Sequence, residues 1–436
     1  MKRIFALVLA SGLAACSAEH SSSSDDSAQA ATVAVDPYRE LMIVHPSVVA
    51  DPLRTSNAGD GHWSFRWLME RLSADSNMSP GEFVEAWLAQ FRLTQVPGTS
   101  APLRDRPGVD ALIAKWPKDR AGHVDLAHSP FRLMAIVNRI DKGTSLGDMG
   151  EGRFVFSLVD QDTMAAHHPD LQAADPMSMT VIFEFHLPGQ PKTAPKDNQQ
   201  RQKNAQKWHA LGGMPFGESY NHALQGLTDA FVSTYGTKSL NQLRTNVIAL
   251  ATSSLLKGQP GPEAESVWEL REFKLVGGKL VVSPVQATAG DAYIGDPTFG
   301  QYLLDNKADL LAGKLALGTF AGFTASQEFS KTRWQFPDVG GQPFPDDVRF
   351  AFAKGTCNGC HNAEQASFAA PQFPEGQSIG FLHITPFVGA DHSPGGDLSG
   401  TERVSGFLKV KDLPRRATFM QNVLANPAST QGTTPY

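Results

Sequence analysis

The chain has 436 residues and only three cysteines, two of which stand in Cys357-Asn358-Gly359-Cys360-His361. The spacing C-x-x-C-H is the attachment signature of a c-type haem. Two thiols at this spacing reach the vinyl groups of one porphyrin as thioethers, and the histidine that follows is carried beneath the iron as its proximal ligand. We therefore expect one covalent haem c, held by Cys357 and Cys360 and ligated by His361. If the remaining cysteine, Cys16, is also modified, no thiol is left for a disulfide.

The start of the chain is typical of an export signal. Lys2 and Arg3 are positively charged, and residues 4–13 form an apolar segment too short to span a bilayer. The segment ends in Leu13-Ala14-Ala15-Cys16, which resembles the lipobox of bacterial lipoproteins. The resemblance implies removal of residues 1–15 and acylation of Cys16. Because serine and not aspartate follows the cysteine, it also implies delivery to the outer membrane. An ordinary signal peptide in which Cys16 has no role is the alternative.

Composition indicates where the folded body begins and which kinds of partner the chain can have. Residues 16–36 are small and polar, so we expect a flexible tether between the acylated Cys16 and a body that begins near Asp36. The whole chain is 41% hydrophobic and 19% charged, which is ordinary for a globular protein. Its formal net charge is −6 and it has no long basic run, so nucleic acid is not an expected partner. The expected partners are a membrane, through the lipid anchor, and an unidentified redox protein.

Periodicity predicts a mixture of strands and helices in residues 37–336. Apolar residues recur at helical spacing in three segments, and Ser79 followed by proline resembles a helix start. Four segments are rich in residues that favour strands and are predicted to be strands. A Gly277-Gly278 turn is predicted to join two of them. Residues 131–141 are strongly apolar and remain ambiguous between strand and helix. The predicted helices are 62–72, 81–92 and 221–235, with a further helix over 299–311; the predicted strands are 153–159, 180–187, 268–275 and 280–285.

These elements show no strict alternation of strand and helix, so the expected fold class is α+β with an antiparallel sheet. Residues 37–336 would form this domain, as one unit or two subdomains, and it resembles no named family. Residues 337–345 hold three prolines and two glycines and are predicted to be a linker. Residues 346–436 follow as a small, mainly α-helical domain. A short helix at 347–354 leading into C-x-x-C-H resembles the entry to mono-haem cytochrome c domains, and residues 413–424 would be its terminal helix.

The second axial ligand of the haem iron has three candidates. His383 lies in an apolar segment suited to packing on a porphyrin face and is the provisional distal ligand. Met420 follows at a sequence distance that resembles soluble mono-haem cytochromes, although their methionine usually comes from a loop and Met420 is predicted to be helical. His392 is the third, and an open coordination site is a further alternative. An open site would permit ligand binding.

In the front domain, Glu184 and His186 are two apart on a predicted strand and share a face. His209 and His222 could converge on them as a metal site, but a hydrogen-bonded polar seam is the favoured interpretation. Asn138 to Asp141 could place polar side chains at a strand end, and an Arg139–Asp141 ion pair would explain them equally well. His167-His168 is expected to be a solvated pair, and Gly150 to Gly152 is too short for a nucleotide loop.

The leading hypothesis is an exported, membrane-anchored c-type haem protein that transfers single electrons. One alternative is an extracytoplasmic oxidoreductase whose front domain is catalytic and whose haem relays electrons. A second alternative is a binding module in which the haem takes a small ligand. No catalytic motif decides whether the chain is an enzyme.

Overall fold

The structure is a computed structural model. It describes residues 34–99, 102–143, 149–161, 176–189, 196–247, 249–251, 269–285, 289, 293–311, 315, 317–320, 325–326, 334–353 and 408–427. Residues 1–33, with the predicted signal, lie outside this part. So do residues 354–407, which contain the C-x-x-C-H motif.

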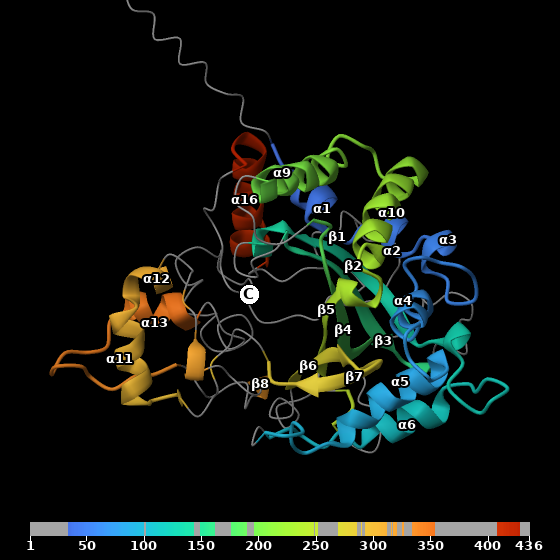
Figure 1. The fold of residues 1–436 in the computed structure, drawn as a ribbon, viewed down its shortest axis with the longest axis horizontal. Helices are drawn as coiled ribbons and strands as arrows, with labels where there is room; N and C mark the ends of the chain where they lie inside the picture. Colours follow the sequence, from blue (N-terminus) through green and yellow to red (C-terminus); the bar gives the residue numbers. More distant parts are fainter. Residues whose placement is uncertain are drawn as a thin grey trace, which may run out of the picture. The chain divides into compact units, whose positions relative to one another are not determined.

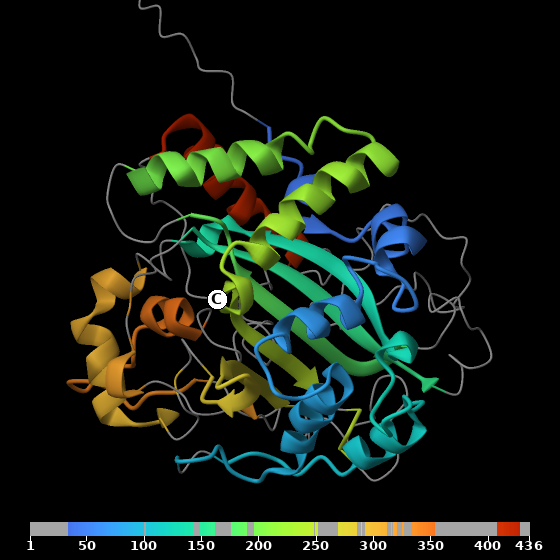
Figure 2. The same ribbon diagram turned by 45° about the vertical axis from the view of Figure 1, so that its right-hand side comes forward.

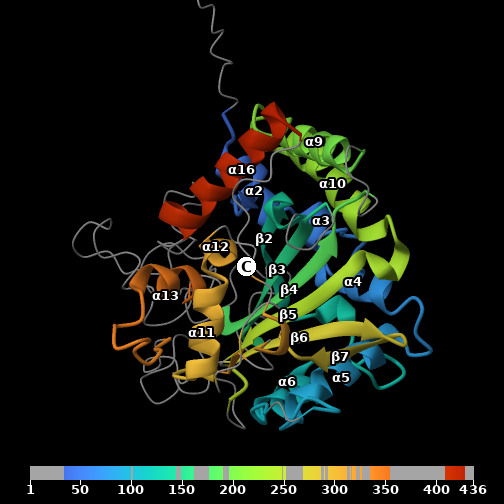
Figure 3. The ribbon, with the colours of Figure 1, turned by 60° about the vertical axis from the view of Figure 1, so that its left-hand side comes forward.

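The described part of the chain is built on an antiparallel sheet, with seven strands hydrogen-bonded in chain order from β1 to β7 (Figures 1 and 3). The short β8 pairs with the start of β6, and β7 pairs with the rest of that strand. The expected fold class, α+β with an antiparallel sheet, is confirmed for this part of the chain. The strands are β1 Met42–Ile43, β2 Phe131–Arg139, β3 Glu151–Val159, β4 Pro176–His186, β5 Leu240–Val247, β6 Glu269–Val276, β7 Lys279–Ser283 and β8 Ala325–Ser326.

The four predicted strands are confirmed as β3, β4, β6 and β7, and the ambiguous segment 131–141 is the strand β2 followed by a short 3-10 turn. Gly277 and Gly278 form the predicted hairpin turn, with φ of 57° and 72°. Two successive residues with positive φ are typical of a type I′ turn, in which glycine meets no steric penalty. The strand β5 was not predicted. Its sequence, LNQLRTNV, is mostly polar and does not alternate, and its polar side chains are accommodated by charged neighbours on β4 and β6.

Helices surround the sheet, and a capping residue predicted the start of one of them, α5. Ser79 Oγ accepts a hydrogen bond from the Glu82 amide at 3.2 Å and thereby caps α5, as its sequence predicts. The predicted helix 299–311 is two helices, because the chain breaks at Asn306. The longer helices are α4 Phe65–Leu72, α5 Pro80–Ala89, α6 Gly108–Lys115, α9 Lys196–His209, α10 Glu218–Ser233, α11 Pro297–Asp305, α13 Asp346–Ala353 and α16 Leu413–Ala425; the shorter ones are α1 Pro37–Glu40, α2 Pro46–Val49, α3 Pro52–Thr55 and α12 Lys307–Leu311.

One face of the sheet carries an aromatic core. Figure 2 shows α4 and α5 (blue) and α10 (yellow-green) in front of the strands. Phe65 of α4 packs its ring 5.8 Å from Phe183 of β4, and Phe231 of α10 lies 5.5 Å from Phe154 of β3, measured between ring centroids. Aromatic rings bury large apolar areas and prefer such tilted or edge-on contacts. This packing fixes which face of each strand points toward the helices.

Gly152 of β3 lies directly beneath the Phe231 ring, and a Cβ added there would overlap that ring. We expect Gly152→Ala to lower the free energy of unfolding by about 1–3 kcal/mol, because the core has no room for a methyl group. Gly226 lies exposed in the helix α10 with no atom near an added Cβ. Gly226→Ala should raise stability by about 0.5–1 kcal/mol through helix propensity. Chemical denaturation of both variants checks the opposite signs.

The two described helices from residues 346–436 pack in different places. Phe352 of α13 belongs to an aromatic cluster with Phe299, Trp334 and Phe344, so part of the predicted linker 337–345 also contributes to a core. The terminal helix α16 instead packs in the core of the sheet domain, beside α9 and α1 (Figure 1). Both helices were predicted, as 347–354 and 413–424, and both are confirmed.

Within the described ranges, no helix combines the length and apolar character needed to cross a bilayer.

Candidate functional site

The residues predicted to hold the haem lie outside the described part of the chain. They are Cys357, Cys360 and His361, with the provisional distal ligand His383 and its alternative His392; Cys16, the predicted acylation site, lies outside it as well. The donor set itself fits the group. Two thiols and an imidazole in this order supply the two thioether bonds and the proximal nitrogen that a c-type haem needs.

Met420, the other distal candidate, is described and is buried in the core of the sheet domain. It lies on α16, and its Sδ is 4.0 Å from Nδ2 of Asn138, which comes from β2. A methionine on the apolar side of a helix is most often a packing residue, and this one has that environment.

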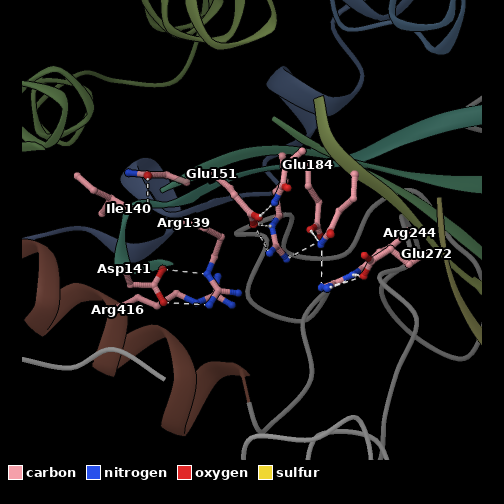
Figure 4. Close-up of polar contacts among 12 residues, drawn as sticks. Arg139, Ile140, Asp141, Glu151, Glu184, Arg244, Glu272 and Arg416 are labelled. Carbon is pink, nitrogen blue, oxygen red and sulfur yellow. Dashed lines mark hydrogen bonds and ion pairs between the residues drawn. The ribbon is translucent and has the colours of Figure 1, made fainter. Parts of the chain in front are cut away.

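The second face of the sheet is lined with buried charges (Figure 4). Arg153 of β3 contacts Glu184 of β4 at 3.2 Å and also Glu151, two residues earlier on its own strand. Arg244 of β5 lies 3.7 Å from Glu184 and 3.0 Å from Glu272 of β6. We name this set the polar face: Glu151, Arg153, Glu184, Gln242, Arg244, Glu272 and Lys274. Its three carboxylates and three cations balance.

Strand register creates the polar face. Arg153 pairs with Glu184, Glu184 with Gln242, and Arg244 with Glu272 across successive strands. Directly opposite residues share a face of the sheet and approach closely, so opposite charges at these positions attract. The Gln242 amide also donates to Glu184 at 2.6 Å. Glu184 therefore lies in a hydrogen-bonded polar seam, as favoured, but its partners there are Arg153, Gln242 and Arg244 and not His209 or His222.

A second charged group lies at the end of β2 and the start of α16. Asp141 accepts two hydrogen bonds from Arg139, both at 2.9 Å, and one from Arg415 of α16 at 3.1 Å. Asp412 bonds Arg415 at 2.8 Å and also pairs with Arg416. We name this group, with the neighbouring Lys142, the strand-end cluster: Arg139, Asp141, Lys142, Asp412, Arg415 and Arg416. It holds four cations and two carboxylates, and the predicted Arg139–Asp141 ion pair is its centre.

Burial and neighbouring charge set the protonation of this cluster. Burial alone would raise the pKa of Asp141, but the adjacent Arg139 outweighs it and holds that pKa far below its usual range. The pKa of Asp412 is likewise lowered, to about 2, because Arg416 and Arg139 outweigh the effect of burial. Burial and the charge of Arg139 lower the pKa of Lys142 to about 7. Lys142 is thus the member of the cluster that can lose its charge near neutral pH.

This lowered pKa predicts a pH-dependent stability. Between about pH 7 and the ordinary lysine value of 10.5, the unfolded chain binds more protons at Lys142 than the folded chain. The free energy of unfolding should therefore rise with pH in this window, by at most about 1.4 kcal/mol per pH unit. The difference between wild type and Lys142→Met should be flat below pH 7 and rise above it, in a buffer without phosphate or carboxylate. Lys115→Met, an exposed control, should show no such slope.

Glu184 and His186 lie two apart on β4, as predicted, but His209 and His222 do not join them in a metal-binding group. Glu184 belongs to the polar face, His209 Nδ1 contacts Glu40 at 2.9 Å, and His222 is exposed. Among the described residues, no group of three or more histidine, cysteine or carboxylate side chains could hold a metal ion. The pair His167-His168 lies outside the described residues.

Several charged residues of these two groups carry a sequence signal that is easy to miss. Glu151 and Arg153 are two apart on one strand, as are Glu272 and Lys274, so each pair shares a face of the sheet. Opposite charges at this spacing, within a predicted strand or directly before it, can indicate a buried ionic face. Arg415 and Arg416 carry no such signal, because only the packing of α16 against the end of β2 brings them to Asp141 and Arg139.

The described fold and site define an α+β protein whose antiparallel sheet has one aromatic and one ionic face. No family model, no curated protein and no solved structure matches this chain.

Proposed function

We propose that this chain is an exported, lipid-anchored c-type haem protein that transfers single electrons. The observation that carries the proposal is the pentapeptide Cys357 to His361 in a chain with only one other cysteine. Two competing uses of C-x-x-C have less support. A structural zinc site needs four ligands, and the chain has no second cysteine pair. A thioredoxin-like redox pair belongs at a strand-to-helix turn of a parallel sheet, whereas the described sheet is antiparallel.

The residues would have distinct roles. Cys357 and Cys360 would bind the porphyrin covalently, and His361 would ligate the iron from the proximal side. His383 is the proposed distal ligand, and the burial of Met420 in the sheet core supports that choice. A haem so held supplies reversible one-electron chemistry at iron, with a potential set by its axial ligands and by burial.

The location follows from the predicted export signal. Covalent attachment of haem in bacteria takes place outside the cytoplasm, so export and C-x-x-C-H support each other. Acylation of Cys16 would anchor the protein, since each buried methylene contributes about 0.8 kcal/mol. We propose the outer membrane as the site of anchoring, with residues 16–36 as the tether to the folded domain.

A reduced pyridine haemochrome spectrum with metal quantitation tests the proposal on the full chain, made in a host that attaches haem. One c-type haem and one iron per chain, with no other stoichiometric metal, is the expected result. A second stoichiometric metal would instead favour the oxidoreductase. Carbon monoxide binding to the ferrous protein would favour the ligand-binding module, because a six-coordinate electron carrier should not take it readily. Absence of haem would refute all three.

A further inference from the structure

The sheet ends in β7, whose outer side has no neighbouring strand in the described part of the chain (Figure 3). Its sequence, KLVVS, contains two adjacent valines and a single charge. An edge strand of this kind presents a row of main-chain groups to which another chain can add a strand. The strand at the opposite edge, β1, is only two residues long. Of these two edge strands, β7 is therefore the one more open to pairing with another molecule.

The side chain of Gln90 occupies this outer side of β7. Its Nε2 donates a hydrogen bond to the Leu280 carbonyl, and its Oε1 accepts one from the Val282 amide at 2.7 Å. Leu280 and Val282 are two apart, so their main-chain groups point to the same side of the strand. A peptide group of a neighbouring strand would make the same two contacts, one as donor and one as acceptor. The Gln90 amide thus takes the place of a strand at this position.

Contacts on both sides of Gln90 in the chain hold it over β7. Gln90 directly follows α5, and α5 packs against β7. The Gln90 carbonyl accepts a hydrogen bond at 2.7 Å from Nη1 of Arg271, which is buried on β6. The rings of Trp87 and Phe91 pack on Phe273 of β6, with centroids 6.0 and 5.7 Å away. Because its backbone is fixed in this way, the Gln90 side chain loses little further freedom when it bonds β7.

We infer that Gln90 is an intramolecular block, which prevents a second copy of this chain from pairing its own β7 with the β7 of the first. Two identical edge strands can pair antiparallel about a two-fold axis, and this arrangement closes into a dimer. Removal of the Gln90 amide would leave the Leu280 carbonyl and the Val282 amide open to such pairing. This block belongs to the sheet and does not require the haem.

Sedimentation velocity of the full-length protein tests the block, with Cys16→Ser in every sample so that a lipid anchor cannot cause association. The protein that keeps Gln90 should be monomeric. Gln90→Ala should dimerise with an association constant at least about tenfold larger, because the freed main-chain groups bond the second copy. Gln90→Ser, whose side chain is also too short to reach β7, should do the same and is used if Gln90→Ala does not fold. Gln95→Ala, which removes a glutamine that donates to a loop carbonyl, is the matched control and should stay monomeric.

Hydrogen exchange at the Val282 amide shows whether the new contact lies at β7. With Gln90 present this amide is hydrogen-bonded and should exchange slowly at every protein concentration. In Gln90→Ala it should exchange faster in dilute samples, where the copies are separate, and slow down again as the dimer forms. Addition of Val281→Lys to Gln90→Ala should restore the monomer, because lysines on paired edge strands repel each other.

Three results would overturn the inference. The first is that Gln90→Ala and Gln90→Ser remain monomeric over the whole concentration range. The second is that the protein with Gln90 intact forms the same dimer with the same association constant. The third is that Gln90→Ala dimerises while the Val282 amide still exchanges rapidly, because the contact would then lie elsewhere on the molecule.

Discussion

Serine in place of both Cys357 and Cys360 will leave the full-length protein without covalent haem. The two thioether bonds form at these sulfurs, and serine oxygen does not replace them. Intact mass should lack the porphyrin increment, and the pyridine haemochrome spectrum of the denatured, acid-extracted protein should lose its c-type signal. We expect this loss to be complete, which makes it the largest change that any substitution in the chain should cause.

The third cysteine provides the matched control. Cys16→Ser should keep the haem increment and lose only lipid modification, measured by intact mass and by partition into detergent. The two results separate the two predicted uses of cysteine in one chain. Retention of covalent haem in the Cys357→Ser, Cys360→Ser protein would contradict the assignment of the motif. Loss of haem in Cys16→Ser material that is still exported would show that attachment involves more than the pentapeptide.

Glu184→Ala will cost about 3–5 kcal/mol of unfolding free energy, the largest stability effect that we expect in the sheet domain. Glu184 is fully buried between Arg153 and Arg244 and accepts a hydrogen bond from Gln242. Its removal leaves the three cations of the polar face with only two carboxylates, Glu151 and Glu272, and leaves the Gln242 amide without its acceptor. Uncompensated buried charge is far more costly than the loss of an exposed ion pair.

Urea denaturation of Glu184→Ala beside Glu70→Ala measures this difference. Glu70 pairs with Arg66 across one turn of α4, and both side chains are more than a third exposed. Its loss should change the unfolding free energy by no more than about 0.5 kcal/mol. Equal effects of the two substitutions would show that water reaches the polar face and screens its charges.

Local sequence was sufficient to predict most elements of the sheet domain. The strands β3, β4, β6 and β7 follow from alternating, β-branched or aromatic residues, and the Gly277-Gly278 turn follows from its position between two of them. Capping by Ser79 likewise predicts the start of α5. These features are local, because side-chain periodicity and backbone conformation are set within a few residues.

The strand β5 shows where local reasoning fails. Its Gln242 and Arg244 would be solvated in an isolated strand, and their burial depends on Glu184 and Glu272 on the neighbouring strands. A polar residue in a strand is therefore predicted to be solvent-exposed until its cross-strand partner is known. The same holds for Met420, whose place in the sheet core depends on where α16 packs.

Residue patterns along the chain were sufficient to derive the α+β class, most of the elements, and the prediction of a covalent haem at Cys357 and Cys360. These follow from periodicity and from the spacing of reactive side chains along the chain. Only the tertiary structure brought Arg415 and Arg416 to Asp141 and buried Lys142 beside Arg139. The physical reason is that the energy of a buried charge depends on partners distant in sequence, and only the packing of α16 against the end of β2 supplies them.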